Sequence, residues 1–469
     1  MHRTHVLAYP RRIAWTTMAA TAVVVPAVCQ ASGFALLEQS ASRLGTAFAG
    51  TAAAADDATT IYFNPAGLSH LGRGEAIIVA SGVGINSEFR SSGSQPALGQ
   101  PLGGEGGDAG DWHLIPSAYL SWPVNDEFAI GIGFNAPFGL VTDYDAGWMG
   151  RFQALRSEIE TMNFNPSISW RANERFSLGL GVSFQRLDAE LTNSVNYSAA
   201  IAQGVQQLVQ LGELPAAAAP AVIAANAGQE GRARVRGHDS AWGFNLGLLF
   251  DVTPTTRIGL AYRSAVDYDV EGTINFAAPS PTHPVGQGVV AAVSAPGGAL
   301  SNGPVSVDIE LPASALLSLR QEVGDRFVLL ADIGWTEWSS VQELRIVRDT
   351  GVTASVTPEE WDDAWRFALG GAYELSDRWT LRAGVAFDDS AVPDSTRTPR
   401  LPDTERYWLA VGASWRPSDS LTVDFGYAHL FSDDVPLDQD AGNPAASGLL
   451  LGEQESYIDV VATQVVWRF

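Results

Sequence analysis

Hydrophobic and polar residues alternate along most of this chain with the period of two that a β-strand requires. The clearest run has an apolar series separated by small or polar residues: Phe176, Leu178, Leu180, Val182 and Phe184 alternate with Ser177, Gly179, Gly181 and Ser183. Successive side chains of a strand point to opposite faces. A strand with one apolar and one small or polar face suits a barrel wall between lipid and a water-filled lumen.

Fourteen spans from Glu75 onward carry this pattern. They are 75–90, 111–123, 126–137, 156–171, 175–192, 231–251, 255–277, 304–322, 325–347, 361–375, 378–389, 403–417, 419–432 and 455–469. An even number of strands is typical of single-chain outer-membrane barrels, in which short periplasmic turns alternate with longer extracellular loops. We therefore predict an all-β fold, a 14-stranded antiparallel transmembrane β-barrel over residues 74–469. The long connections at 193–230, 278–303 and 433–454 are its expected extracellular loops.

The two ends of the chain agree with an exported barrel. Every second residue back from Phe469 forms one face of a closing strand: Trp467, Val465, Thr463, Val461 and Tyr457. A terminal Phe on such a strand resembles the signal that the bacterial barrel-assembly machinery recognises. We expect that machinery to be a partner. At the other end, basic residues precede an apolar run over 13–28 that is too short to span a bilayer as a stable helix. Residues 1–31 are predicted to be a signal peptide.

Two segments depart from the strand pattern. Residues 32–73 precede the barrel and are predicted to form an N-terminal luminal hatch, because a 14-stranded barrel is wide enough to hold such a plug. Within the loop 193–230, residues 199–211 have apolar side chains at helical spacing: Ile201, Val205, Leu208 and Val209. A partly helical extracellular loop is expected there, and its helix is either a packed loop element or an apolar surface that captures ligands.

Composition excludes several kinds of chemistry. The chain has no lysine, so a phosphate-binding P-loop lysine and a Schiff-base lysine are absent. Its single cysteine, Cys29, lies in the predicted signal peptide, which excludes thiol catalysis and thiolate metal sites from the mature chain. A net charge of −24 makes nucleic acid a very poor partner. We predict no cofactor and no metal site.

The main observation in favour of an enzyme is the pair His238 and Ser240. A His and a Ser two residues apart lie on one strand face, as in outer-membrane phospholipases. No third member of a catalytic group is evident, so we predict that the protein is not an enzyme. A general diffusion porin is the other alternative, which the hatch-like segment and the apolar loop oppose.

Several short motifs resemble one known family when they are taken in order. The hatch contains Gly33–Glu38, Leu44–Gly50, Ala55–Asp57 and Asn64–Gly67. They are followed by Asn135–Leu140, Trp148, Arg151, Asn165–Ser167, Ala386–Ser390, Val392–Pro393, Leu401–Asp403 and Arg406–Trp408. Over essentially the whole mature chain this series resembles the FadL/TodX (OMPP1) family of outer-membrane long-chain fatty-acid and aromatic-hydrocarbon transporters.

The resemblance implies passive transport of hydrophobic compounds across the outer membrane of a Gram-negative bacterium. Extracellular loops capture the compound, a pocket against the hatch receives it, and it leaves sideways into outer-membrane lipid through a kink in the third strand. The expected substrate-binding residues are Phe34, Leu36, Leu37, Leu208, Val209 and Arg366.

The kink is assigned to Asn135, Pro137, Phe138 and Gly139. Proline has no N–H to give the strand ladder, so Pro137 can interrupt pairing within the wall. The alternative is a proline at a strand end, where pairing stops anyway. Asn64, Pro65 and Gly67 are expected to structure the hatch, because Asn-Pro favours a turn.

The charge of the substrate is a separate question. Fatty-acid carriers of the family place basic groups near the pocket, where alignment by eye puts Thr192 and Thr357. A carboxylate buried without a charged partner is costly, which favours neutral hydrocarbons. Arg186, Arg366 or Arg382 could substitute. By alternation Arg366 and Arg382 face the lumen, where ion pairs with Asp388 and Asp424 are the competing explanation.

Overall fold

The computed structural model describes residues 33–439 and 442–469. The predicted signal peptide, residues 1–31, lies outside the described residues. No helix in the described part of the chain is long and apolar enough to cross a membrane.

The chain forms a closed barrel of 14 antiparallel strands, as the alternation predicted. Several strands are interrupted, so the wall consists of 20 segments. They are β1 (Glu75–Ser91), β2 (Trp112–Pro123), β3 (Phe128–Asn135), β4 (Gly139–Asp143), β5 (Arg156–Arg171), β6 (Phe176–Asn196), β7 (Glu230–Thr253), β8 (Thr256–Arg263), β9 (Val266–Ala277), β10 (Gly303–Leu311), β11 (Ser314–Val323), β12 (Phe327–Thr336), β13 (Glu343–Arg348), β14 (Thr353–Pro358), β15 (Ala364–Ser376), β16 (Trp379–Asp388), β17 (Arg406–Ser418), β18 (Leu421–Ser432), β19 (Val435–Gln439) and β20 (Leu450–Arg468). The barrel closes where β1 pairs with β20, from Glu75↔Arg468 to Ser91↔Gly452.

Three segments lie outside the predicted strand spans. β4 pairs with β5, and β19 pairs with β20 inside the expected loop 433–454. β14 lies between the predicted spans 325–347 and 361–375 and pairs with β13 as a hairpin. Its side chains are mostly exposed and have no apolar alternation. Backbone pairing alone therefore defines it, and periodicity could not reveal it.

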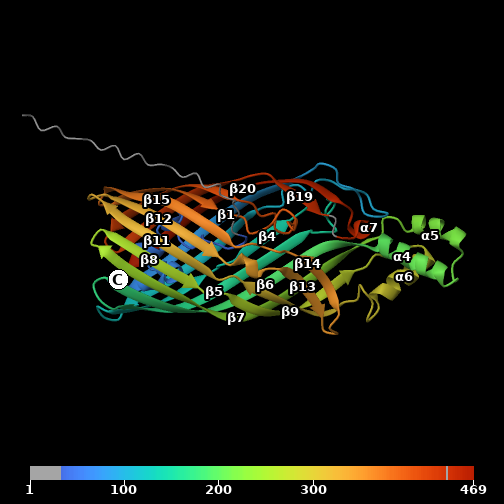
Figure 1. The fold of residues 1–469 in the computed structure, drawn as a ribbon, viewed down its shortest axis with the longest axis horizontal. Coiled ribbons are helices and arrows are strands. Elements are labelled where there is room, and N and C mark those ends of the chain that lie inside the picture. Colours follow the sequence, from blue (N-terminus) through green and yellow to red (C-terminus); the bar gives the residue numbers. More distant parts are fainter. Residues whose placement is uncertain (1–32, 440–441) are drawn as a thin grey trace, which may run out of the picture.

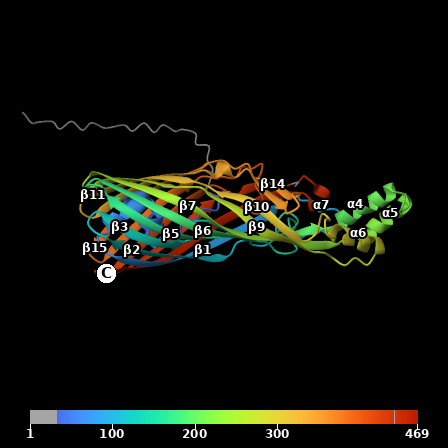
Figure 2. The same cartoon turned by 90° about the horizontal axis from the view of Figure 1, so that it is seen from below.

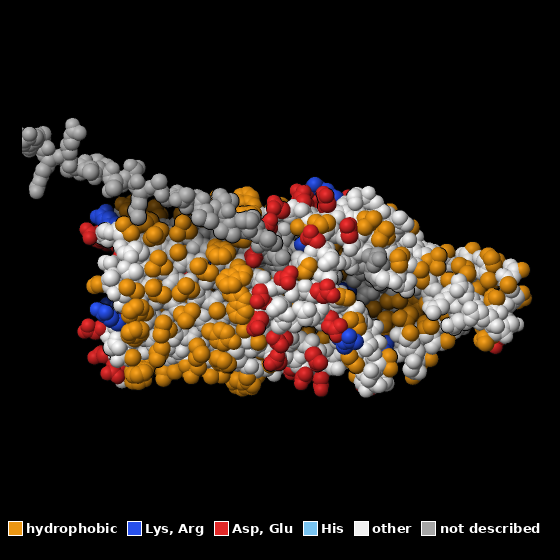
Figure 3. Space-filling model, viewed as in Figure 1, with side chains coloured by type: hydrophobic (Ala, Val, Ile, Leu, Met, Phe, Trp, Pro, Cys, Tyr) orange, Lys and Arg blue, Asp and Glu red, His pale blue; other side chains and the backbone are white. Residues whose placement is uncertain are grey.

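The outward face of the barrel is apolar. The predicted series from Phe176 to Phe184 faces outward, and each of its members is 39–45% exposed. Figure 3 shows the resulting band of hydrophobic side chains, with Asp and Glu gathered beyond it toward the loops. This arrangement matches a wall whose apolar band contacts lipid.

Short helices gather at the end opposite the C-terminus, as both views of the fold show (Figures 1 and 2). They are α4 (Tyr197–Gln210), η2 (Ala216–Ala218), α5 (Ala219–Ala225), α6 (Pro284–Ser294) and α7 (Pro444–Ser447). The predicted loop helix is α4, and its buried residues Ile201 and Val205 pack with Val290 of α6. The long loops are therefore partly helical.

Residues 33–73 lie inside the barrel, and we call them the hatch (Figure 1). They contain α1 (Ala41–Leu44), α2 (Thr51–Ala54), α3 (Thr60–Phe63) and η1 (Pro65–His70). Glycines of the wall let the two backbones touch. A Cβ added to Gly384 would lie 2.2 Å from the backbone of Thr46, and one added to Gly412 would lie 2.7 Å from the Cα of Gly45. The hatch is seated directly on the wall at these points.

Polar side chains of the wall also hold the hatch. Gln464 accepts a hydrogen bond from the Ala41 amide (3.2 Å), and Glu75 accepts one from the Ala58 amide (2.8 Å). Wall carboxylate and amide oxygens thus satisfy hatch backbone groups that have no sheet partner.

The three predicted hatch-structuring residues lie where the chain turns. The Asn64 side chain accepts from the Ala66 amide at the start of η1, and Pro65 is the first residue of that helix. A Cβ added to Gly67 would lie 2.1 Å from Thr60 Oγ1. Their contribution to the stability of the hatch remains a prediction.

Candidate functional site: the strand break and the cavities beside the hatch

The third strand of the barrel is broken between Asn135, the last residue of β3, and Gly139, the first residue of β4. β2 pairs with β3 only from Ala118↔Phe134 to Pro123↔Ala129. Among the described residues, the β2 segment 112–117 has no strand partner on this side, although β1 pairs with it on the other side. We call residues 135–139 the kink. The wall is unpaired beside it.

The kink bonds to the hatch and to β5 instead of to β2. The amide of Leu36 donates to the carbonyl of Pro137 (2.8 Å), and the amide of Gly139 donates to the carbonyl of Phe34 (3.0 Å). The Thr161 hydroxyl accepts from the Phe138 amide (2.9 Å) and donates to its carbonyl (2.7 Å). The first residues of the hatch thus occupy the place of a strand neighbour.

An aromatic cluster fixes this end of the hatch. The ring centroid of Phe34 lies 5.9 Å from Phe138, 5.0 Å from Trp338 and 6.1 Å from Trp361. The preceding amide, of Gly33, donates to the buried Asp403 carboxylate (3.0 Å). Phe34 therefore joins the hatch, the kink and the two segments that carry Trp338 and Trp361 in one apolar contact.

A cavity of about 190 Å³, which we call the kink cavity, lies at the strand break. Its lumen-facing lining includes Leu36, Val83 and Ile115, which are at least partly buried. Its lining also includes the outward-facing residues Leu114 and Met162, which are 70% and 55% exposed. One apolar cavity thus borders residues of both faces of the wall.

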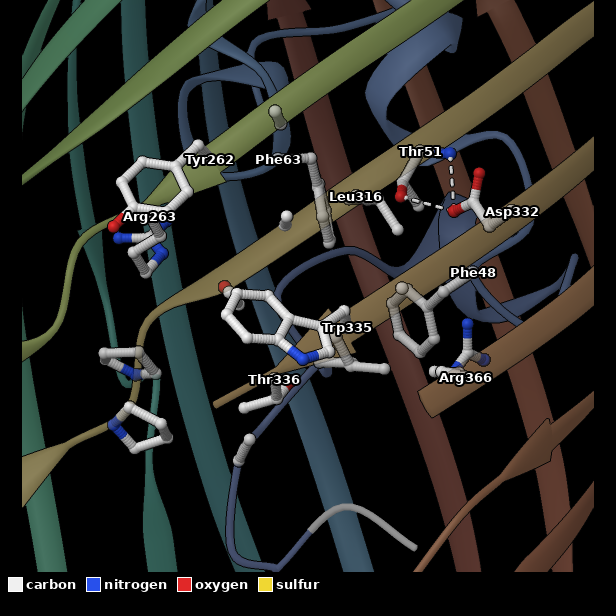
Figure 4. Close-up of a pocket in the computed structure, with 18 of the residues that line it drawn as sticks. Phe48, Thr51, Phe63, Tyr262, Arg263, Leu316, Asp332, Trp335, Thr336 and Arg366 are labelled. Atoms are coloured by element: carbon white, nitrogen blue, oxygen red, sulfur yellow. Dashed lines mark hydrogen bonds between the residues drawn. The ribbon is translucent and has the colours of Figure 1, made fainter. Parts of the chain in front are cut away.

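A second cavity, the hatch cavity, has a volume of about 130 Å³. Its walls are mainly apolar and include Leu36, Leu37, Phe48, Phe63, Pro137, Phe138, Leu316 and Trp335. Its charged residues are Arg263, Asp332 and Arg366. Figure 4 shows Arg263 beside Tyr262 on one side and Arg366 beside Phe48 on the other. Leu36 and Phe138 line both this cavity and the kink cavity, so the two cavities are neighbours.

Two of the three charged groups in the hatch cavity have partners of opposite charge or donors that satisfy them. Arg366 forms an ion pair with Asp388 (3.0 Å) and donates to the Ala47 carbonyl (2.6 Å). Asp332 accepts from the amide of Gly50 (2.9 Å) and from the hydroxyl of Thr51 (2.9 Å). Arg263 donates to the Tyr62 carbonyl (2.9 Å) and lies over the Tyr62 ring, 4.4 Å from its centroid.

The residues considered for carboxylate binding are dispersed. Thr192 accepts from the Arg156 amide, and Thr357 pairs with Leu344 in the β13–β14 hairpin; neither lines the hatch cavity. Arg186 is an exposed residue paired with Asp188, and Arg382 lies 3.7 Å from Asp424.

Arg263 lines the hatch cavity but is not one of the arginines considered for carboxylate binding on the sequence alone. It belongs to the lumen-facing series of β8, but it is the last residue of that segment, and alternation is weakest as a guide at segment ends.

Among the predicted ligand residues, Leu36, Leu37 and Arg366 line the hatch cavity, whereas Phe34 lines a neighbouring cavity of about 120 Å³. Leu208 lines a larger groove of about 1010 Å³ between α4, α6 and α7, which we call the loop groove. Val209, the next residue of α4, does not line it. The sequence pattern could not separate these two neighbours.

Two His–Ser pairs of the described chain lack the geometry of an activated serine. His238 and Ser240 are both exposed, and no hydrogen bond joins them within the described chain. His70 Nε2 lies 2.9 Å from Ser177 Oγ, but His70 Nδ1 faces Arg257 Nη2 at 3.2 Å. Arginine can only donate, so Nδ1 accepts and Nε2 carries the proton. His70 therefore cannot take the proton of Ser177.

The described residues contain no group of three or more His, Cys, Asp or Glu side chains placed to hold a metal ion.

Known proteins resemble this chain over most of its length. A long-chain fatty acid transport protein of Salmonella typhi is 30% identical over 428 residues, which cover 90% of this chain and 93% of that protein. A 47 kDa outer membrane protein of Pasteurella multocida is 33% identical over 415 residues, which cover 88% and 91%. Both relatives therefore match this chain over most of its length.

Solved structures also resemble this chain over most of its length. The crystal structure of a Pseudomonas aeruginosa FadL homologue superposes with a TM-score of 0.81 at 27% identity and covers 93% of this chain and 100% of that one. The Pseudomonas putida toluene transporter TodX shares the fold, with a TM-score of 0.63 at 18% identity over 88% and 94% of the two chains. The family model described as outer membrane protein transport protein (OMPP1/FadL/TodX) matches residues 22–469. This chain belongs to that family of outer-membrane transport proteins.

Proposed function

We propose that the protein carries hydrophobic compounds, long-chain fatty acids or neutral hydrocarbons, passively across the outer membrane. The loop groove captures the compound, the hatch cavity holds it, and the kink cavity releases it sideways into lipid. The observation that carries this proposal is the kink cavity, because its lining includes lumen-facing residues and the outward-facing Leu114 and Met162 beside an unpaired stretch of wall.

Lateral release agrees with the energetics of an apolar cargo. A hydrocarbon that enters the aqueous periplasm exposes its surface at a cost of about 25 cal/mol per Å². A hydrocarbon that passes from the kink cavity into the bilayer core avoids this cost. The route needs no energy source.

The seating of the hatch favours the same route. Passage straight through the barrel would require the hatch to leave the wall, with loss of the backbone contacts at Gly384 and Gly412 and of the hydrogen bonds to Gln464 and Glu75. Lateral release requires movement only near Phe34–Leu36, where the hatch meets the kink.

The names of the similar proteins mention two classes of substrate. The name of the Salmonella typhi relative points to long-chain fatty acids, whereas toluene is named for a structure that shares only the fold. Thr192 and Thr357 do not line the hatch cavity, so their lack of charge does not exclude a carboxylate there. We therefore retain both cargo classes.

The proposal assigns no catalytic role to the protein. Its further partners are outer-membrane lipid around the apolar band and the barrel-assembly machinery, which would read Phe469. This residue is half exposed, and its amide donates to the Gly74 carbonyl at the start of β1 (2.9 Å).

The test is uptake of labelled oleate and labelled hexadecane by cells that make or lack the protein. We expect faster uptake of at least one ligand in cells that make it. Swelling of protein-containing liposomes in small sugars tests the porin alternative. A general porin admits sugars, whereas this barrel is expected to exclude them. Sugar permeation without hydrophobe uptake would refute the proposal.

A further inference from the structure

We propose that Arg263 is the residue of the hatch cavity that recognises a carboxylate, so that the cargo of this protein includes fatty acids in their ionised form. This inference rests on the proposed transport function and names the specificity-determining group within it.

The observed contacts of Arg263 with the described residues include no carboxylate. Three arginines line the hatch cavity and the neighbouring cavity, namely Arg263, Arg366 and Arg406. Arg366 is paired with Asp388, and Arg406 is paired with Asp403. Within the described chain no carboxylate lies within 4.0 Å of the Arg263 guanidinium; its observed contacts are the Tyr62 carbonyl and the Tyr62 ring.

Several other arginines inside the barrel have a carboxylate partner. Arg43 pairs with Asp56, Arg257 with Asp251, and Arg468 with Glu75. A guanidinium in a partly buried, mainly apolar cavity is disfavoured unless an anion or several acceptors face it. Arg263 has no such partner among the described residues and is therefore an available anion site on the wall of a cavity that can hold an apolar chain. Arg400, which donates to the Ser157 hydroxyl (3.1 Å), also has no carboxylate within 4.0 Å in the described chain, but it lines neither cavity.

The chemistry of the guanidinium fits a carboxylate. It has five N–H donors, and one of its nitrogens is used by the Tyr62 carbonyl, so other donors remain for a planar two-oxygen acceptor. The apolar lining, with Leu36, Leu37, Phe48 and Phe63, would contact the acyl chain of the same ligand.

The neighbouring cavity is a poorer place for an anion. Its lining contains Glu38, Asp388 and Asp403 against the single Arg406. The hatch cavity has two arginines against Asp332, whose oxygens already accept from Gly50 and Thr51. A carboxylate is thus directed toward the hatch cavity, and Figure 4 places Arg263 on the side away from the paired Arg366.

The experiment compares labelled oleate with labelled methyl oleate, which has the same chain but no charge. In cells, Arg263→Leu is expected to lower the rate of oleate uptake at low ligand concentration about tenfold, because a hydrogen-bonded charge partner is lost. Uptake of methyl oleate is expected to stay at the wild-type rate. Arg263→Lys, which keeps the charge, is expected to retain most oleate uptake.

Two variants separate recognition from folding. Arg263→Gln keeps an amide donor for the Tyr62 carbonyl but removes the charge. Its oleate uptake is expected to fall about tenfold, as in Arg263→Leu. This variant keeps the test decisive if Arg263→Leu assembles poorly. Arg320→Leu removes another arginine of the wall, one that is paired with Glu322 and lines neither cavity, and it is expected to leave the oleate rate unchanged.

The outcomes distinguish the inference from the proposed function. Equal losses of oleate and methyl oleate in Arg263→Gln, or unchanged oleate uptake, would overturn the role of Arg263 while transport stands. Wild-type protein that accelerates methyl oleate but not oleate would do the same. If wild-type protein accelerates neither ligand, transport itself is refuted and the role of Arg263 falls with it.

Discussion

The backbone amide of Leu36 in the hatch donates a 2.8 Å hydrogen bond to the carbonyl of Pro137 in the kink. Ala35 and Phe138 face each other as an isolated antiparallel bridge beside this bond. The hatch thus completes the edge that the broken third strand leaves open. Any movement of residues 34–36 must alter the kink.

A disulfide across this bridge should stop transport reversibly. The hydrogen bonds flank Ala35 and Phe138 on either side, so the two form a non-hydrogen-bonded pair, whose Cβ atoms are close enough for a disulfide with small adjustment. In the Ala35→Cys/Phe138→Cys double variant, uptake of a labelled hydrophobe should fall to near the level of cells without the protein under oxidising conditions and recover with a reductant. Each single variant is the control. Full uptake by the oxidised double variant would contradict release at the kink.

Restoring a backbone donor at the kink should slow release. Pro137→Val supplies an N–H and relaxes the restriction on φ, so the unpaired stretch of β2 gains a possible partner. We expect uptake to fall at least about threefold while the barrel still assembles, because proline is disfavoured within a paired strand. Heat-modifiable migration on a gel reports assembly. Pro123→Val, at the far end of β2, is the matched substitution and should have little effect on uptake; normal uptake by Pro137→Val would count against the kink as the exit.

Removal of the Phe34 ring should loosen only the first part of the hatch. Its contacts with Phe138, Trp338 and Trp361 are lost in Phe34→Ala, at a cost of about 3 kcal/mol for a buried aromatic. Hydrogen exchange measured by mass spectrometry should accelerate for residues 33–37. Residues 40–68, which the wall holds independently, should exchange as in the wild type. Faster exchange through the entire hatch would show that it moves as one body.

The glycine seat of the hatch should tolerate no side chain. Gly384→Ala places a Cβ against the Thr46 backbone, and overpacking of this kind costs about 1–3 kcal/mol. We expect a lower Tm for the purified protein and greater sensitivity of cells to a large antibiotic that intact barrels exclude. Gly303→Ala is the control, since nothing lies within 4 Å of its added Cβ. Equal Tm values for the two variants would argue against direct seating.

Two neighbouring residues of α4 test capture at the loop groove. Leu208→Asp puts a charge into the groove, whereas Val209→Asp puts the same charge beside it. Uptake by Leu208→Asp should be slower at low ligand concentration and approach the wild-type rate at high concentration, because capture limits the rate only when ligand is scarce. Val209→Asp should have the smaller effect. Identical kinetics for the two variants would exclude the groove as the capture surface.

The sequence by itself determined the barrel and the place of its break. The alternation in each span fixes which side chains face lipid, because a strand repeats every two residues wherever it lies. Proline at position 137 marks an interruption by its missing N–H alone. The helical spacing in α4 was equally local.

Only the tertiary structure decided what meets at the site. The contact of Phe34 with Trp338 and Trp361, the pairing of Leu36 with Pro137 and the lack of a carboxylate beside Arg263 join residues far apart in the chain. Periodicity places a side chain on a face but does not give its partner across a barrel lumen. Arg366 and Arg263 look alike in the alternation, yet Asp388 neutralises one and leaves the other available, because the fold brings a carboxylate to only one of them.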